Sequence, residues 1–143
     1  MRIDRAELRK GLAETRTFLL AHHLPAEFDR CYAVTVFGRR LHLCARCLGV
    51  YPGIAAGLLA SFVWNGAGLL AVAVLPAPAL FDWTVTTFSA RRGSNPVRTV
   101  TGFLLGCGYG LGLALLAGGS SVQVLGIGAL YATISGCLLY YSW

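Results

Sequence analysis

The amino-acid sequence predicts an all-α integral membrane protein with four short transmembrane helices arranged as two hairpins, preceded by an amphipathic N-terminal helix. Hydrophobic residues make up 56% of the 143 residues and charged residues only 13%, which is more apolar surface than a soluble domain of this size can bury. Residues 47–81 and 99–143 contain no Asp, Glu, Lys or Arg, and each stretch is long enough for two short spans. This composition excludes a disordered, a collagen-like and a disulfide-rich secreted protein.

Residues 1–21 are the first expected element, an amphipathic helix. Its apolar residues Ile3, Leu8, Leu12 and Leu19 are interspersed with charged residues, as in a helix that lies on a membrane surface. A solvated helix that docks on the rest of the protein would have the same pattern, and both interpretations stay open. Because no long apolar run follows the charges, we do not expect a cleavable signal peptide.

Turn-forming residues divide each uncharged stretch near its middle, with Asn-Gly-Ala-Gly at 65–68 and Gly-Gly-Ser-Ser at 118–121. The expected spans are therefore 48–64, 69–83, 100–117 and 122–143. A single membrane domain, 1–143, then consists of the helix 1–21, a Cys/His segment 22–47, a hairpin 48–83, a loop 84–99 and a hairpin 100–143.

Pro76 and Pro78 interrupt the second span, and the carbonyl groups freed there need partners, so we expect a kink.

The positive charges predict the orientation in the membrane. With four spans, all 12 Lys and Arg residues fall on one side together with both termini, and cytoplasmic loops carry the excess of these residues. We therefore expect a multi-pass protein of the cell (inner) membrane with a cytoplasmic N-terminus and C-terminus. The lipid bilayer is then the main partner, and the net charge of +6 requires no nucleic acid.

Glycine occurs at every fourth position in two of the expected spans, at 49, 53 and 57 and again at 102, 106 and 110. Such GxxxG rows let two helix backbones approach closely, and they predict that copies of the chain associate through glycine faces as a homo-oligomer. The rows are offset by 53 residues (102 − 49), and the same offset relates the two turn sequences. This suggests an internal duplication of a helical hairpin, although chance in a glycine-rich chain would give the same pattern.

Cysteine and histidine cluster in one segment. Three of the five cysteines and all three histidines lie within residues 22–47. A cytoplasmic location disfavours disulfides, and a Cys-x-x-Cys pair brings two sulfurs to the spacing that a tetrahedral Zn²⁺ requires. We therefore expect a zinc site. Its expected ligands are Cys44 and Cys47, one or both of His22 and His23, and Cys31 or His42.

Two other uses of the cysteines stay open. Cys44 and Cys47 at a helix N-terminus would also suit a thiol-redox couple, because Arg46 between the sulfurs and the helix dipole both favour thiolates. Alternatively, the cysteines are structural residues that bind no metal.

The block at 44–51 (Cys-Ala-Arg-Cys-Leu-Gly-Val-Tyr), preceded by the His22-His23 pair and by Arg30, resembles the domain-of-unknown-function 2085 family of small membrane proteins. The resemblance continues at Asp82 and through the polar residues of 94–102, and it covers about residues 22–110. This chain has His-His where the family more often has Cys-His. The resemblance implies a multi-span membrane protein with a Cys/His cluster, and the family brings no established activity.

Polar residues near the expected cytoplasmic face form a second candidate site. The expected anion-binding residues are Arg46, Arg98, Ser94 and Asn95. A carboxylate at the end of a span usually has a partner, so we expect an Asp82–Arg98 ion pair that joins the two hairpins.

Whether the chain is an enzyme stays open. In a metal-assisted enzyme that acts on a lipid headgroup or another anion, Asp82 would be the candidate catalytic base. A small transporter is a further alternative, although no acidic or basic residue lies deep in an expected span, where coupling residues are expected.

Overall fold

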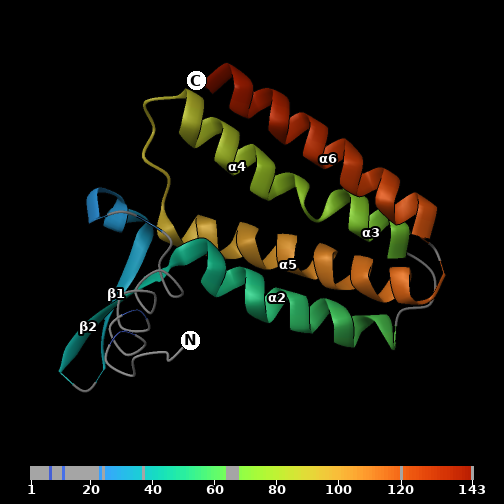
Figure 1. Ribbon diagram of the computed structural model, residues 1–143, viewed down its shortest axis with the longest axis horizontal. Helices are drawn as coiled ribbons and strands as arrows, with labels where there is room; N and C mark the ends of the chain where they lie inside the picture. The colour runs from blue at the N-terminus through green and yellow to red at the C-terminus, as the bar shows by residue number, and fades with distance from the viewer. Residues whose placement is uncertain are drawn as a thin grey trace. The chain divides into compact units, whose positions relative to one another are not determined.

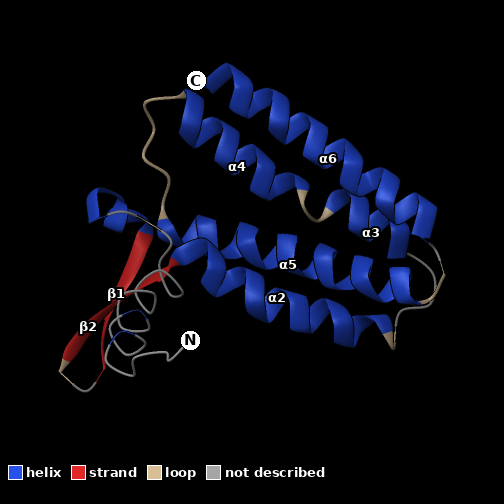
Figure 2. Ribbon diagram, viewed as in Figure 1, coloured by secondary structure: helices blue, strands red, loops and turns tan. Residues whose placement is uncertain are grey.

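The computed structural model of the chain describes residues 7, 11, 23, 25–36, 38–63, 68–119 and 121–142. The chain divides into two compact units, residues 1–45 and 46–143, whose elements are labelled in Figure 1. Figure 2 shows that the strands belong to the first unit and the long helices to the second. Of the predicted amphipathic helix 1–21, only Glu7 and Gly11 are described, so that prediction lies outside the described residues.

The first unit contains a β-hairpin, which corrects the expectation of helices alone. A short 3₁₀ helix, η1 (Pro25–Arg30), leads into β1 (Cys31–Val36), which pairs antiparallel with β2 (Arg39–Cys44). Strand β1 is rich in β-branched residues, which favour a pleated backbone. Gly38 in the connecting turn has a φ of 73°, a left-handed conformation that glycine adopts without steric penalty.

The second unit is a bundle of helices. These are α2 (Ala45–Ser61), α3 (Gly68–Val74), α4 (Ala77–Phe88), α5 (Asn95–Ala117) and α6 (Ser121–Ser142). Three stretches of it are long and apolar enough to cross a membrane, namely Gly68–Phe88, Asn95–Ala117 and Val122–Ser142, whereas α2 is shorter. The all-α membrane fold therefore holds for this unit. Helices α4 and α5 leave only residues 89–94 between them, a shorter connection than the predicted loop 84–99.

Large apolar side chains cover the outside of the second unit. Leu59 of α2 is 68% exposed, Phe81 of α4 is 72% exposed and Val122 of α6 is 82% exposed. A soluble monomer rarely exposes contiguous apolar surface on this scale, whereas lipid solvates such side chains well. The surface of the unit therefore agrees with a location in a membrane.

Helices α2 and α5 lie side by side (Figure 1) and pack backbone against backbone through the two glycine rows. A Cβ atom added to Gly53 would contact the carbonyl oxygen of Phe103 and lie 3.0 Å from Cα of Gly106. A Cβ atom added to Gly106 would likewise contact the carbonyl oxygen of Val50 and lie 3.0 Å from Cα of Gly53. Any side chain at these positions would force the two backbones apart.

Each glycine of one row faces a backbone carbonyl of the other helix, and every such contact has a counterpart in the second row. The facing pairs are Gly49 with Thr99 and Gly102 with Arg46, Gly53 with Phe103 and Gly106 with Val50, and Gly57 with Cys107 and Gly110 with Ile54. The carbonyl positions in each pair of contacts differ by the same 53 residues (99 − 46, 103 − 50, 107 − 54). The two helices therefore run parallel and are related by a local two-fold axis, as in a symmetric dimer.

The glycine rows are thus buried against each other within one chain. The association of copies through glycine faces stays a prediction, and it would compete with this internal contact. The first residues of α3 and α6 also differ by 53 positions (121 − 68), which agrees with the suggested duplication of a hairpin.

The helical path is interrupted between α3 and α4, in agreement with the kink predicted from the prolines. Pro76 and Pro78 have no N–H group to donate to the carbonyls four residues earlier. The hydroxyl group of Tyr131 in α6 donates a 2.6 Å hydrogen bond to the carbonyl oxygen of Ala73. A side chain of α6 thereby satisfies a backbone group at the break, where no water is present in lipid.

We predict that Gly53→Ala destabilises the protein, because the added methyl group meets backbone atoms of α5 that cannot rotate away. Overpacking of this kind typically costs about 1–3 kcal/mol, which thermal unfolding in detergent would detect. Gly126→Ala in α6 is the matched control, since nothing lies within 4 Å of its added Cβ. Equal melting temperatures for the two variants would contradict the backbone contact.

We predict that Tyr131→Phe lowers thermal stability, because the carbonyl of Ala73 loses its donor in an apolar setting. The expected loss is about 1 kcal/mol or somewhat more, accompanied by faster hydrogen exchange in α3 and α4. Tyr140→Phe serves as the control, since Tyr140 is 81% exposed. A Tyr131→Phe protein with the stability and exchange rates of the control would disprove this role.

Candidate functional site

Four side chains of the first unit form a chain of contacts. Nδ1 of His23 lies 3.2 Å from Oε2 of Glu27, and Nε2 of the same ring lies 3.4 Å from Sγ of Cys44. The other carboxylate oxygen of Glu27, Oε1, lies 3.1 Å from Nη1 of Arg30. When Nδ1 carries the ring proton, it donates to Glu27, and Nε2 presents its lone pair to the sulfur of Cys44.

Helix η1 and the hairpin position these groups. Glu27 lies in η1, four residues after His23, and Cys44 is the last residue of β2. Cys31, the first residue of β1, is the register partner of Cys44, and both cysteines are buried. Residues directly opposite each other in an antiparallel pair share one face, and His42, two positions before Cys44, lies on that face too.

The imidazole of His42 packs on an aromatic ring, whereas that of His23 contacts Glu27 and Cys44. Its ring stacks on Phe28, with ring centroids 4.0 Å apart and an interplanar angle of 10°. This contact packs the hairpin against η1 and gives His42 a structural role. Of the two alternatives for a further ligand, Cys31 and His42, the stacking therefore favours Cys31.

The spacing of the His23–Cys44 pair is compatible with a shared metal ion. Zinc binds sulfur at about 2.3 Å and imidazole nitrogen at about 2.0–2.1 Å, so a tetrahedral site separates the two ligand atoms by about 3.6 Å. The distance of 3.4 Å is close to that value, and it also suits a hydrogen bond between the thiol and the imidazole. The pair can therefore bind a metal or act as a thiol and its base.

The structure brings together two of the five predicted metal ligands, His23 and Cys44. Within the described parts of the chain, no group of three or more His, Cys, Asp or Glu side chains has the arrangement of a metal site. His22 lies outside the described residues. Cys47 is the third residue of α2 and belongs to the second unit.

Asp82 has a different partner from the one predicted. Nη2 of Arg46 donates a 2.6 Å hydrogen bond to Oδ2 of Asp82, and the two side chains are 27% and 9% exposed. The expected Asp82–Arg98 pair is therefore corrected to Arg46–Asp82. The ion pair joins the first turn of α2 to α4, and a buried carboxylate requires such a partner.

Arg98 is buried at the start of α5. Its Nη1 donates a 3.3 Å hydrogen bond to Oδ1 of Asn95, one turn earlier in the same helix. Ser94 is exposed and occupies the N-cap position of α5. Of the four predicted anion-binding residues, these three thus lie together around one helix N-terminus, whereas Arg46 is held by Asp82.

Two features of these sites were not predicted from the sequence. The carboxylate of Glu27 contacts His23, and the sequence carried a signal for this contact, because the two residues are only four positions apart. The pairing of Arg46 with Asp82 had no local signal, because the two residues are 36 positions apart.

Comparisons with known proteins agree with the resemblance in the sequence. The family model described as "Predicted membrane protein (DUF2085)" matches residues 29–112. The "Uncharacterized protein MJ1492" of Methanocaldococcus jannaschii is 28% identical over 96 residues, which cover 62% of this chain and 57% of that protein. This chain therefore spans little more than half the length of that relative. No solved structure matches the chain.

The family match begins in η1, includes the hairpin and helices α2 to α4, and ends within α5. It covers more than half of the chain, together with Cys44, Cys47, Arg46 and Asp82. The chain belongs to the DUF2085 family of predicted membrane proteins.

Proposed function

We propose that this multi-pass membrane protein holds Zn²⁺ on its cytoplasmic side through His23 and Cys44, completed by Cys47 and by Cys31 or His22. The observation that carries the proposal is the setting of His23. One ring nitrogen contacts a carboxylate and the other faces a cysteine sulfur at 3.4 Å. Histidine ligands of metals almost always donate their second N–H to a carboxylate, a carbonyl or water.

A metal would have a clear role in the first unit. Very small units cannot bury enough apolar surface to be stable and usually need a metal, disulfides or oligomerisation. The proposed ligands of the first unit lie two residues before η1 (His23), at the start of β1 (Cys31) and at the end of β2 (Cys44). One zinc ion would therefore connect these elements, and binding would contribute directly to the folding of the segment.

A thiol-redox function is the second candidate. A redox couple requires two cysteine sulfurs that can reach each other, and the sequence spacing of Cys44 and Cys47 would allow it. The imidazole nitrogen beside Cys44 supports metal binding more directly, because a dithiol couple needs no histidine ligand.

The enzyme and transporter alternatives have less support. Asp82 is less suited to act as a catalytic base, because its Oδ2 already accepts a hydrogen bond from the cationic Arg46. A transporter would need ionisable groups along its pathway, and Arg46 and Arg98 both lie in the first turn of their helices.

We also propose that α2 is a fourth span and that both termini are cytoplasmic. Helix α2 has 17 residues, the lower limit for a span, and it runs parallel to α5 through the glycine contact. A parallel neighbour in direct backbone contact lies at the same membrane depth. The Lys and Arg residues then gather on one side, which the positive-inside rule assigns to the cytoplasm of the cell (inner) membrane.

We predict that the purified protein contains about one equivalent of zinc and that Cys44→Ser and Cys47→Ser each lose it. Glu27→Gln should retain the site but weaken zinc affinity about 10–100-fold, because the carboxylate orients His23. Zinc binding should weaken as pH falls, since protons compete for the thiolates. Metal analysis by mass spectrometry and a competition titration with a chelator would measure these effects.

Cys137→Ser is the matched control for the zinc experiment, because Cys137 is an exposed residue of α6. It should keep the full zinc content. A zinc-free wild type with a titratable pair of thiols would refute the metal site and favour the redox candidate instead.

We predict that a cysteine introduced at Gly118 reacts with a membrane-impermeant thiol reagent in intact cells, whereas one at Ser94 does not. Both positions are exposed and lie at opposite ends of α5, so the pair reports the orientation of one helix. The experiment uses a Cys107→Ser/Cys137→Ser background. Labelling at Ser94 from outside would overturn the proposed orientation.

A further inference from the structure

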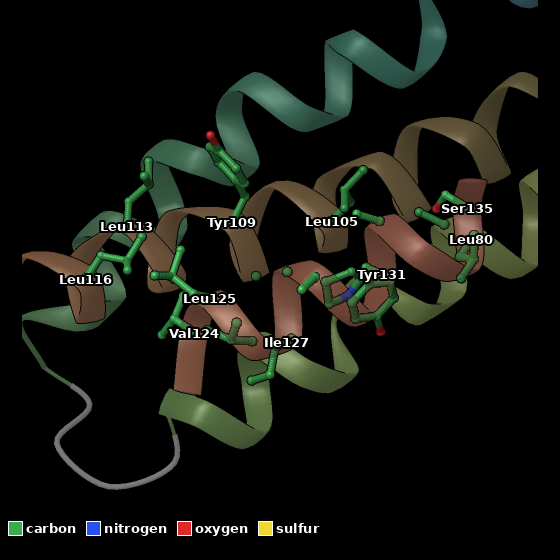
Figure 3. Close-up of a pocket in the computed structure, with 18 of the residues that line it drawn as sticks. Leu80, Leu105, Tyr109, Leu113, Leu116, Val124, Leu125, Ile127, Tyr131 and Ser135 are labelled. Carbon is green, nitrogen blue, oxygen red and sulfur yellow. The ribbon is translucent and has the colours of Figure 1, made fainter. Parts of the chain in front are cut away.

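The second unit contains a cavity of about 790 Å³ bounded by α3, α4, α5 and α6 (Figure 3). This volume lies within the range of about 300–1,000 Å³ that is usual for small-molecule sites. The walls are mainly apolar, with Leu105 and Leu116 from α5, Val124 and Ile127 from α6, and Leu80 from α4. The cavity belongs to neither of the sites described above, although Arg46 reaches it.

The charged group of the cavity lies at one end. Among the described residues that line it, Arg46 is the only charged one. Arg46 binds Asp82, two residues beyond Leu80 in α4, and Figure 3 shows Ser135 beside Leu80. The other end, at Val124, lies near the turn between α5 and α6 and is apolar. The cavity is therefore amphiphilic along its length.

Arg46 has hydrogen-bonding capacity beyond its ion pair. A guanidinium group carries five N–H donors, and the hydrogen bond to Asp82 uses one on Nη2. Its Nε atom is buried and has no hydrogen-bond partner among the described residues. A buried donor without an acceptor is unfavourable, so a ligand that brings acceptor oxygens to Arg46 would be stabilised at this end.

The cavity is open toward the lipid-facing surface. Tyr109 of α5 and Leu125 of α6 line it, yet they are 57% and 62% exposed. Helix α6 also packs loosely at its glycines, since nothing lies within 4 Å of a Cβ added to Gly126, Gly128 or Gly136. A molecule in the bilayer can therefore enter from the side, between α5 and α6.

We propose that this cavity binds one anionic phospholipid of the bilayer, with an acyl chain along the apolar walls and the phosphate at Arg46. The chemistry follows from the amphiphilic cavity, its lateral opening and the donors of Arg46. In the proposed orientation, Arg46 lies on the cytoplasmic side, where anionic lipids are concentrated. The inference goes beyond the zinc site and uses none of its ligands.

The test is native mass spectrometry of the detergent-purified protein with added dioleoyl phosphatidylglycerol. The wild type should retain one phosphatidylglycerol and should not retain dioleoylglycerol, which has the same chains and no phosphate. Equal retention of the two lipids would overturn the role of Arg46, and a dimer without bound lipid would show that a second copy fills the cavity instead.

Variants at two places test the apolar walls and the polar end of the cavity separately. Gly128→Leu places a side chain in the cavity and should abolish the lipid adduct, whereas Gly136→Leu, on the same helix but outside the lining, should retain it. An adduct that persists in Gly128→Leu would refute the cavity as its site. The double variant Arg46→Gln/Asp82→Asn removes both charges, so no buried carboxylate is left unpaired, and it should lose the preference for phosphatidylglycerol over dioleoylglycerol.

The zinc proposal and this one can fail separately. A Cys44→Ser protein without zinc should still retain phosphatidylglycerol, because the cavity lies entirely in the second unit. Loss of the lipid in this variant, with Gly136→Leu still loaded, would contradict the independence of the two sites.

Discussion

The contact between the backbones of α2 and α5 is the constraint on which the second unit depends. Because only glycine allows this approach, the two helices are held parallel and in register, and their N-terminal ends lie at one end of the bundle. Arg46, at the start of α2, is thereby placed where it can reach Asp82 in the middle of α4. The opposite face of α5 is free to contact the proline break, since Gly108 lies against Pro76. Helix α5 thus packs against α2 on one side and against the break between α3 and α4 on the other.

The membrane helices could be predicted from the sequence because their signals are local and strong. Long uncharged stretches, turn residues and paired prolines each act within one element. The hairpin at 31–44 could not be predicted in the same way, since its strands are short and follow a cluster of charged residues. The partner of Asp82 depends on how α2 packs against the bundle, and no pattern near Asp82 distinguishes Arg46 from Arg98. Contacts between distant elements were therefore the least predictable.

In the candidate zinc site, too, the local sequence pattern carried a signal, whereas the contacts between side chains could not be predicted. The spacing of Cys44 and Cys47 and the neighbouring histidines indicated a metal site, but the sequence did not distinguish His22 from His23. In the structure, the carboxylate of Glu27 gives His23 a defined orientation toward Cys44. His42, which had equal standing with Cys31 as a further ligand, packs on Phe28 instead. Side-chain geometry thus supports His23 as a candidate ligand, a distinction that sequence spacing alone does not make, while His22 lies outside the described residues.

The position of the glycine rows in the chain has a consequence for biogenesis. A ribosome releases the glycines of α2 long before those of α5. With α2 as a fourth span, as proposed above, its glycine surface would face lipid until the chain has returned across the membrane through α3 and α4 and α5 has inserted parallel to α2. Closure of the bundle would then be a late step of synthesis, and in the interval the bare backbone of α2 would be open to other helices.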